Sequence, residues 1–469
     1  MTAGLTAAWV THWSAAPGRP AVWTPPTGWL TAAELEERTR IAAYRLAGAG
    51  LLPGDRVLLS GAPSAELLTA YVAVLRLRAV VVPANTAYTD RELAHIVGDV
   101  RPAAALLDRP RDLPAVPWVS GLDLAGKPRE VPLDAAAGTD AALIGYTSGT
   151  TGAPKGAVLS HGNLRSGAAA LLDAWRWTAD DRLVSALPLF HMHGLGVAVN
   201  GTLLAGASIA LLPKFGVEEV LDAVGRHGAS LFFGVPTMYS RLAGSPRAGE
   251  LTTLRLAVSG SAPLPPDLWH ALAATTGQRV VERYGMTETV MLTSNPYDGE
   301  RRPGTVGLPL PGVQVRLAER GAGVEVRGPN VFAGYWERPQ ASAAAFTADG
   351  WFRTGDVGEW SADGYLSLVG RATELIITGG FNVYPREVED VLRGHPAVRD
   401  AAVVGLPDPE WGEVVVAYCV GERVPEEELA AYCAQRLAAF KRPRRWRWLD
   451  DLPRNAMGKV VRGELRGLG

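Results

Sequence analysis

Short apolar runs alternate with helix-like segments through the N-terminal half of this chain. Helical spacing over residues 31–49 is followed by an apolar run at 56–60, and a second helical segment precedes the run at 79–83. This alternation is typical of parallel sheets joined by right-handed helical crossovers, so we predict an α/β fold. Thr31 is expected to cap the first helix, with Glu34 completing a capping box. Four later apolar runs repeat the pattern, at 182–187, 208–212, 230–234 and 255–259.

The pattern changes twice toward the C-terminus. Residues 304–369 contain short strand-like runs with frequent glycine and proline, which predicts a small β subdomain. After Arg371, helical patterns at 385–394 and 425–439 flank strand-like runs at 401–404 and 414–420. We therefore predict two domains. They are an N-terminal domain of residues 1–370, with the β subdomain at about 304–370, and an α+β C-terminal domain of residues 371–469.

Composition excludes several functional classes. The chain has 469 residues and a formal net charge of −2, whereas general nucleic-acid affinity usually requires a basic domain. The uncharged run at 194–213 is interrupted by Asn200, Thr202 and four glycines, which favours a buried helix, turn and strand over a membrane span. Cys419 and Cys433 lack a metal-ligand pattern, and the N-terminus lacks the pattern of a signal peptide. We expect a reduced, cytoplasmic protein with no nucleic-acid, membrane or stable protein partner.

The run Tyr-Thr-Ser-Gly-Thr-Thr-Gly-Ala-Pro-Lys-Gly at 146–156 is a candidate phosphate-binding loop. Glycine N–H groups and small hydroxyls can approach a polyphosphate closely, and the lysine supplies countercharge. It is not the common P-loop, which has Ser or Thr after its lysine where this chain has Gly156. A surface turn would explain the glycines but not four hydroxyls in five positions. The candidate residues are Thr147, Ser148, Gly149, Thr150, Thr151, Gly152 and Lys155.

Lysine is rare in this chain. Only five of its 46 basic residues are lysines, at 127, 155, 214, 441 and 459. A chain that chooses arginine for most of its charge is expected to keep lysine where a compact point charge is needed. Lys155 and Lys459 are therefore candidates even before their motifs are considered.

Four further motifs follow the candidate loop. The run Ser-Gly-Ser-Ala-Pro-Leu at 259–264 predicts a tight turn beside a flat ligand, although a plain strand-to-helix turn explains it equally well. The run Glu-Arg-Tyr-Gly-Met-Thr-Glu-Thr at 282–289 combines a ring that can stack on a base with a carboxylate suited to Mg²⁺. Asp356, in the run 351–356, is expected at a turn where it could accept hydrogen bonds from ribose. The run 453–459 ends in Lys459.

Together these motifs resemble those of the acyl-adenylate-forming enzymes, which include acyl- and aryl-CoA synthetases, adenylation domains and beetle luciferase. The resemblance runs from about residue 30 to the C-terminus. It implies a large N-terminal domain of two α/β sheets plus a β subdomain, with a small mobile C-terminal domain joined near Arg371. The motifs stand in the family order, at 146–156, 284–288, 351–356, 370–371, 379–385 and Lys459.

The resemblance implies an ATP-dependent acid–CoA ligase that uses ATP, Mg²⁺ and coenzyme A. A carboxylate is a poor electrophile, so it is first joined to AMP with release of pyrophosphate, and the CoA thiol then displaces AMP. Lys459 would bridge the carboxylate and the α-phosphate, and would leave when the mobile domain rotates. The family usually has lysine or aspartate two positions after Arg371, where this chain has Thr373; we expect domain rotation to survive.

The resemblance also implies roles for the other motif residues. Lys155, with Thr147, Ser148 and Thr150, would hold the β- and γ-phosphates, and Glu288 with Thr150 would position Mg²⁺. Tyr284 would stack on adenine, Asp356 and Arg371 would hold the ribose, and Gly379, Gly380 and Phe381 would line the thiol tunnel. The remaining predicted ATP-site residues are Gly149, Thr151, Gly152, Ser261, Ala262, Pro263, Glu282, Gly285, Met286 and Thr287.

Arg283 is the main indication of the substrate. An arginine in the acyl pocket is costly against an apolar tail but favourable against a second carboxylate. The runs at 259–264, 282–289 and 293–299 look like those of malonyl-CoA synthetases. In that subfamily an arginine, a serine and a histidine hold the distal carboxylate, which matches Arg283, Ser261 and either His191 or His193. We predict malonate or methylmalonate as the substrate.

Other interpretations remain open at the level of sequence. Arg283 could pair with Glu282 or Glu288 and never meet the substrate, which would then be a fatty or aryl monocarboxylate. The same adenylation step would also serve a protein that loads a separate carrier protein. A catalytically silent nucleotide-binding relative would be expected to lack Lys459 or Glu288, and both are present.

Overall fold

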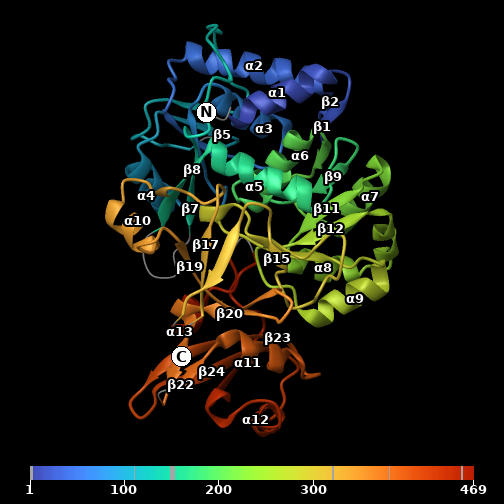
Figure 1. Cartoon of the computed structure of the whole chain (residues 1–469), viewed down its shortest axis with the longest axis vertical. Helices are drawn as coiled ribbons and strands as arrows, with labels where there is room; N and C mark the ends of the chain where they lie inside the picture. The colour runs from blue at the N-terminus through green and yellow to red at the C-terminus, as the bar shows by residue number, and fades with distance from the viewer. Residues whose placement is uncertain are drawn as a thin grey trace. The chain divides into compact units, whose positions relative to one another are not determined.

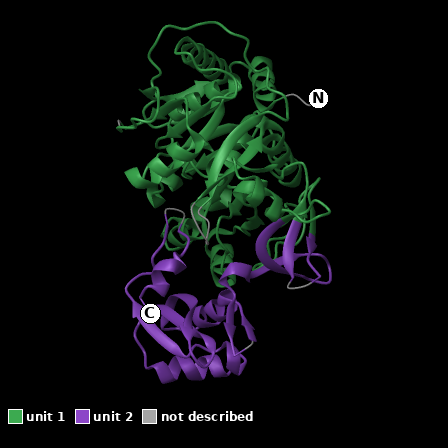
Figure 2. Cartoon of the chain, turned by 90° about the vertical axis from the view of Figure 1, so that its left-hand side faces the viewer, with its two compact units in different colours: residues 1–315, 326–352 green, residues 316–325, 353–469 purple. Residues whose placement is uncertain are grey.

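The computed structural model describes residues 4–109, 111–147, 154–319, 322–379, 381–455 and 458–468. The predicted site residues Ser148, Gly149, Thr150, Thr151, Gly152 and Gly380 lie outside these ranges. The chain forms two compact units, which are coloured separately in Figure 2. The first contains Met1–Val315 and Val326–Phe352, and the second contains Arg316–Glu325 and Arg353–Gly469.

The first unit contains a seven-stranded sheet in the order β18-β8-β7-β4-β3-β5-β6. The strand pairs β3–β4, β3–β5, β4–β7 and β5–β6 are parallel, whereas β7–β8 and β8–β18 are antiparallel. Its parallel strands are almost wholly apolar, as expected where helices cover both faces. The strands are β3 (Arg56–Ser60), β4 (Val80–Pro83), β5 (Ala104–Leu107), β6 (Val119–Gly121), β7 (Ala141–Thr147), β8 (Lys155–Ser160) and β18 (Gly334–Tyr335).

The first unit also contains a nine-stranded sheet in the order β15-β14-β13-β12-β11-β9-β10-β1-β2. Its centre, from β13 through β12, β11, β9 and β10 to β1, is parallel. The strands are β1 (Pro20–Thr24), β2 (Gly28–Thr31), β9 (Arg182–Ser185), β10 (Ser208–Leu211), β11 (Leu231–Gly234), β12 (Leu256–Ser259), β13 (Val281–Tyr284), β14 (Thr293–Ser294) and β15 (Leu308–Pro309).

Helices cover these sheets through apolar faces. In Figure 1, α7, α8 and α9 lie along one flank of the nine-stranded sheet, where Leu221, Leu242 and Leu272 pack with Phe232 and Val184 in one core. Across the described part of the chain, no helix is long and apolar enough to cross a membrane. The helices of this unit are α1 (Leu5–Ala15), α2 (Ala32–Gly48), α3 (Ala65–Arg76), α4 (Asp90–Val100), α5 (His161–Ala174), α6 (Asn200–Ala205), α7 (Val217–His227), α8 (Pro236–Ala243), α9 (Pro266–Thr276) and α10 (Pro339–Ala345), with a π-helix, η1 (His193–Val199), and 3₁₀ turns η2 (Ala248–Thr253) and η3 (Thr287–Thr289).

The second unit contains most of a four-stranded sheet, in the order β16-β17-β19-β20, and a five-stranded sheet in which β22-β21-β24-β23 is extended by β25 on β24. Cys419 and Cys433 are buried as free thiols in the core of the latter. The strands are β16 (Gln314–Leu317), β17 (Gly323–Arg327), β19 (Phe352–Trp360), β20 (Leu366–Arg371), β21 (Ile376–Thr378), β22 (Phe381–Val383), β23 (Val398–Asp408), β24 (Gly412–Gly421) and β25 (Arg445–Leu449). The helices are α11 (Pro385–Arg393), α12 (Glu426–Ala434) and α13 (Arg462–Arg466), with 3₁₀ turns η4 (Ala372–Glu374) and η5 (Ala439–Lys441).

The predicted α/β architecture is confirmed, but two local predictions are wrong. Helix α12 ends at Ala434, not near residue 439. Asp356 does not lie at a turn, because Phe352, Thr354 and Asp356 point inward along the nine-residue strand β19. Gly355 accommodates this path with a φ of +77°. The compact units divide the chain at 352/353 and place 316–325 in the second unit, so the predicted hinge at Arg371 stays a prediction.

The capping box of α2 gives a stability prediction. The Thr31 hydroxyl accepts a hydrogen bond from the backbone N–H of Glu34, and the Glu34 carboxylate accepts one from the backbone N–H of Thr31. Thr31→Ala is expected to lower the free energy of unfolding by about 1 kcal/mol, measured by urea denaturation. The control is Thr27→Ala in the preceding turn. Equal effects of the two substitutions would contradict the capping role.

Candidate active site

Parallel pairing brings several predicted site segments to one edge of the nine-stranded sheet. Strands β9, β11, β12 and β13 run in the same direction, with Ser259 at the end of β12 opposite Glu282 of β13. The segments that follow the carboxyl ends of these strands therefore emerge at the same edge. This is where open α/β sheets usually bind ligands.

Arg283, Ser261, Gly260 and His193 form a cluster at this edge. The Arg283 side chain is buried, with 6% of the residue exposed, and Nδ1 of the His193 ring lies 3.3 Å from the Ser261 hydroxyl. A Cβ atom on Gly260 would lie 2.2 Å from Cζ of Arg283, so the guanidinium packs directly against this glycine. Any larger residue at this position would displace the Arg283 side chain from this contact. Ser261 itself adopts a left-handed φ of 70°.

The buried Arg283 charge has no protein partner among the described residues. Its Nε and Nη2 atoms lack hydrogen-bond partners there, and it forms no ion pair with Glu282 or Glu288. The Glu282 carboxylate instead accepts a hydrogen bond from the backbone N–H of Leu264, at 2.9 Å. Burial lowers the pKa of Arg283 to about 9, which still leaves the guanidinium protonated at pH 7. An uncompensated buried charge is costly, and an anion would compensate it.

The two candidate histidines differ in their surroundings. His193 is buried, and this burial, followed by the charges of Arg283 and His191, lowers its pKa well below the ordinary value. The His193 ring is therefore neutral at pH 7. His191 is partly exposed and packs against the ring of Phe190, with ring centroids 4.6 Å apart. His193 is the histidine whose ring contacts Ser261 in the Arg283 cluster.

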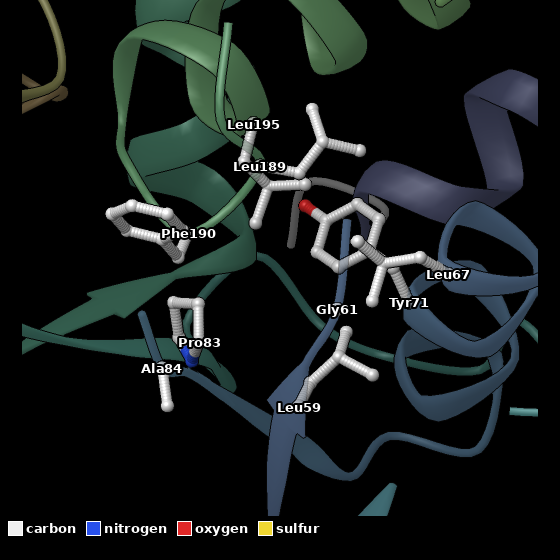
Figure 3. Close-up of a pocket in the computed structure, with 9 residues that line it drawn as sticks. All are labelled: Leu59, Gly61, Leu67, Tyr71, Pro83, Ala84, Leu189, Phe190 and Leu195. Carbon is white, nitrogen blue, oxygen red and sulfur yellow. The ribbon is translucent and has the colours of Figure 1, made fainter. Parts of the chain in front are cut away.

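Two small hollows lie beside the segment 189–195. One is lined by residues that include Gly145, Tyr146, His191, Met192 and Thr287. Gly145 is needed there because a Cβ would lie 2.5 Å from the Thr287 methyl group. The second hollow is mainly apolar, and Figure 3 shows Leu67 and Tyr71 of α3 on one side of it and Phe190 and Pro83 on the other. Pro83, Phe190 and Leu195 line both hollows.

Lys155 and Glu288 are linked through a residue that the sequence did not single out. The Tyr335 hydroxyl donates a hydrogen bond to Oε1 of Glu288 at 3.1 Å, and Nζ of Lys155 lies 5.4 Å from the centroid of the Tyr335 ring. Glu288 is buried in η3, with 4% exposed. The only available sequence signal was a Gly-Tyr pair more than forty residues beyond Glu288.

The segment predicted to hold adenine follows β13. Tyr284 is largely buried at the end of this strand. A Cβ on Gly285 would lie 2.4 Å from the carbonyl oxygen of Val290, so the backbone turns tightly here. The backbone N–H of Met286 donates to the Thr289 hydroxyl at 3.3 Å. In the neighbouring segment after β12, Ala262 is half-buried and Pro263 is exposed.

Asp356 and Arg371 are paired within the second unit. They lie opposite each other on the antiparallel strands β19 and β20, and Nε of Arg371 lies 2.9 Å from Oδ1 of Asp356. The backbone N–H of Asp356 donates to the Thr354 hydroxyl at 3.1 Å. The two predicted ribose ligands are thus adjacent, although the strand that carries Asp356 was expected to be a turn.

Lys459 is exposed in the second unit. Its backbone N–H donates to the Asn455 side chain at 3.0 Å, and its carbonyl oxygen accepts from the Asn455 backbone N–H at 2.9 Å. Arg454 bonds the carbonyl oxygen of Gly458 and the carboxylate of Asp400. These interactions restrain the backbone at Gly458 and Lys459.

Two of the three residues predicted for the thiol tunnel are described, and both lie near β21 and β22. Gly379 has a φ of +55°, and its N–H donates to the carbonyl oxygen of Trp411 at 2.8 Å. Phe381 is 53% exposed and stacks on Phe440 with ring centroids 4.6 Å apart. An exposed aromatic ring of this kind offers an apolar contact to a ligand.

The donor set suits Mg²⁺ held together with phosphate. Within the described ranges, no group of three or more His, Cys, Asp or Glu residues could hold a metal ion alone. Mg²⁺ is usually bound through one or two carboxylates plus substrate phosphates. Glu288, a buried carboxylate near Lys155 and the end of the candidate loop, fits that pattern.

Comparison with protein-family models identifies the family. The model described as "AMP-binding enzyme" matches residues 10–336, and "AMP-binding enzyme C-terminal domain" matches residues 387–459. The chain belongs to the AMP-binding enzyme family. The acyl-adenylate-forming family predicted from the motifs is therefore confirmed.

Individual relatives of this AMP-binding enzyme differ in their acids. The chain is 39% identical to a feruloyl-CoA synthase of Amycolatopsis sp, over 93% of each chain. It is 35% identical to a malonate–CoA ligase of Arabidopsis thaliana, over 89% of this chain and 79% of the relative. The crystal structure of ATP-bound MatB from Rhodopseudomonas palustris matches with a TM-score of 0.94 and 40% identity, over 100% of this chain and 99% of that chain.

The unpaired charge of Arg283 gives a prediction about stability without ligand. Arg283→Met is expected to raise the free energy of unfolding by about 1–4 kcal/mol, because a methionine of similar length removes a buried charge that has no partner. Chemical denaturation measures the change. The matched control is Arg255→Met, which breaks a 2.5 Å ion pair with Asp181 and is expected to destabilise the protein. Destabilisation by both substitutions would contradict the account of Arg283.

Proposed function

We propose that this AMP-binding enzyme converts malonate or methylmalonate into its CoA thioester through an acyl-adenylate. The observation that carries the proposal is the buried Arg283 guanidinium, whose Nε and Nη2 have no partner among the described residues. It lies beside Ser261 and the neutral ring of His193. This set of groups suits a carboxylate, which can accept two hydrogen bonds from one guanidinium.

The broader chemistry follows from the family. The chain is an AMP-forming acid–CoA ligase that uses ATP, Mg²⁺ and coenzyme A. The acid itself is a proposal, because feruloyl-, malonate- and indoleacetate-CoA ligases all occur among relatives at 35–39% identity.

The proposed selectivity has a physical basis. The distal carboxylate of malonate would neutralise Arg283, whereas the alkyl tail of a monocarboxylate would leave the charge buried and unpaired. Removing one partner of a buried ion pair usually costs about 3–5 kcal/mol. A site built around a polar partner therefore discriminates strongly against an analogue that lacks it.

The histidine has a defined part in this scheme. When the Ser261 hydroxyl donates to Nδ1 of His193, the imidazole proton sits on Nε2, which has no hydrogen-bond partner within the described part of the chain. We assign His193 as a neutral donor to the distal carboxylate. His191, which lines the neighbouring hollow, would contact the acyl group.

The remaining roles are proposals by family resemblance, consistent with the geometry. Lys155 would neutralise charge on the β- and γ-phosphates, and Glu288 would help to hold Mg²⁺. The paired Asp356 and Arg371 would hold the ribose: the Asp356 carboxylate would accept hydrogen bonds from the ribose hydroxyls, and the Arg371 guanidinium would donate to them. Lys459 would stabilise the charge that builds up as the carboxylate attacks the α-phosphate. Thr147 would contribute its hydroxyl to the phosphates together with the loop residues outside the described ranges.

A monocarboxylate ligase is the second candidate. The Amycolatopsis feruloyl-CoA synthase is 39% identical over 93% of both chains, and the hollow in Figure 3 is mainly apolar. This alternative requires Arg283 to remain buried without an anionic partner. Malonate and methylmalonate therefore remain the preferred acids.

The test is CoA-dependent AMP release from ATP with malonate, methylmalonate, acetate, octanoate and 4-coumarate in parallel. The proposal predicts that kcat/KM is highest for malonate or methylmalonate. A preference for a monocarboxylate would keep the ligase chemistry and overturn the substrate. AMP formation that requires a carrier protein instead of CoA would favour the adenylation of a carrier-bound acid.

Arg283→Ala separates recognition from chemistry. The substitution is expected to lower kcat/KM for malonate by at least roughly a hundredfold, since removing one partner of a buried ion pair costs about 3–5 kcal/mol. The value for acetate, which has no second carboxylate, should change less than tenfold. Arg283→Lys is the matched control, because it keeps the charge without the bidentate geometry. Its kcat/KM for malonate should lie between the values for the unsubstituted protein and Arg283→Ala. Equal losses for malonate and acetate would exclude the recognition role.

A further inference from the structure

Tyr335 contacts both residues proposed for the phosphate end of the site, through different parts of one side chain. Its hydroxyl donates to Oε1 of Glu288 at 3.1 Å, and its ring centroid lies 5.4 Å from Nζ of Lys155. The second distance is within the range of a cation–π interaction. We propose that Tyr335 is a positioning residue for Mg²⁺-ATP: the hydroxyl orients the Glu288 carboxylate and the ring holds the Lys155 ammonium. The inference rests on the proposed roles of Glu288 and Lys155.

The backbone fixes Tyr335 relative to Lys155. Strand β18 pairs antiparallel with β8, so that Tyr335 lies opposite Ala157, two residues beyond Lys155. The Tyr335 N–H donates to the Ser342 hydroxyl at 2.8 Å. A Cβ on Gly334 would lie 2.7 Å from that same hydroxyl oxygen, so the glycine permits this contact. The ring therefore has a fixed position beside the start of β8.

The segment 332–335 also contacts the backbone of Glu288. The backbone N–H of Phe332 donates to the carbonyl oxygen of Glu288 at 2.8 Å. The Phe332 ring meets the Tyr335 ring edge-on, with centroids 4.9 Å apart at 74°. Glu288 is thus held by its backbone and by its side chain from one short stretch of chain, 332–335. This arrangement restricts both the position and the orientation of the carboxylate.

A hydrogen bond to a metal-ligating carboxylate fixes its plane and tunes its interaction with the metal. Loss of such an outer partner typically costs about 10–100-fold in metal affinity or activity. For a buried carboxylate such as Glu288, the phenol hydroxyl also replaces part of the hydration lost on burial. A residue that only filled space would not affect the dependence of the reaction on Mg²⁺.

Two substitutions separate the effect of the Tyr335 hydroxyl from that of its ring. Tyr335→Phe removes the hydroxyl and keeps the ring, and should raise the Mg²⁺ concentration for half-maximal AMP release by roughly 10–100-fold at fixed ATP. Tyr335→Leu removes both and should in addition raise the KM for ATP. The matched control is Tyr418→Phe, which removes a buried hydroxyl bonded to the carbonyl oxygen of Leu465 at 2.7 Å and should leave the Mg²⁺ dependence unchanged.

A double-substitution cycle tests the route through Glu288. In a Glu288→Gln background, Tyr335→Phe should produce no further shift in the Mg²⁺ dependence. Calorimetric titration with a non-hydrolysable ATP analogue, with and without Mg²⁺, provides a readout that is independent of turnover and of the acid. Tyr335→Phe should weaken binding only when Mg²⁺ is present.

Three outcomes would overturn the inference. The Mg²⁺ dependence of Tyr335→Phe could equal that of the unsubstituted protein, or the effect could persist in full in the Glu288→Gln background. Glu288→Gln could also leave the Mg²⁺ dependence unchanged, which would remove the proposed metal role of Glu288 as well. A failure of malonate as the substrate would be seen separately, when AMP release is compared among the five acids. If Tyr335→Leu does not fold, Tyr335→Phe alone still tests the role of the hydroxyl.

Discussion

The parallel pairing of β9, β11, β12 and β13 is the constraint on which the acid-binding part of the site depends. Each of these strands is only four residues long, and their common direction sends the following segments to one edge of the sheet. The edge receives Ser261 after β12, the end of β13 with Arg283, and the segment leading from β9 to His193. Hydrogen bonds between backbones thus assemble side chains that are far apart in the sequence.

The buried Arg283 charge has opposite effects on the stability of the free protein and on its selectivity between acids. The Arg283 guanidinium is held against Gly260 without a partner of its own among the described residues, at a cost to the folded state. The same cost becomes a source of discrimination once an anionic substrate compensates the charge. The phosphate end is organised differently, because there Tyr335 already engages both Glu288 and Lys155.

Sequence reasoning predicted what depends on local pattern and missed what depends on distant contacts. The strand at 56–60 and the capping box of Thr31 follow from short-range periodicity and are confirmed. Asp356 was misplaced because Gly-Asp favours a turn locally, whereas pairing with β20 keeps the segment extended. Tyr335 escaped notice because β18 is two residues long and pairs with a strand far earlier in the chain. The choice between His191 and His193 required their packing.

The central claim is that a charge on the distal end of the acid is recognised by Arg283. The most direct measurement compares kcat/KM for malonate with that for monomethyl malonate, which keeps the reacting carboxylate and the carbon chain but lacks the distal charge. The account predicts a value for the ester that is lower by roughly a hundredfold or more, because the buried guanidinium is then left without an anionic partner. Similar values for the two acids would contradict it.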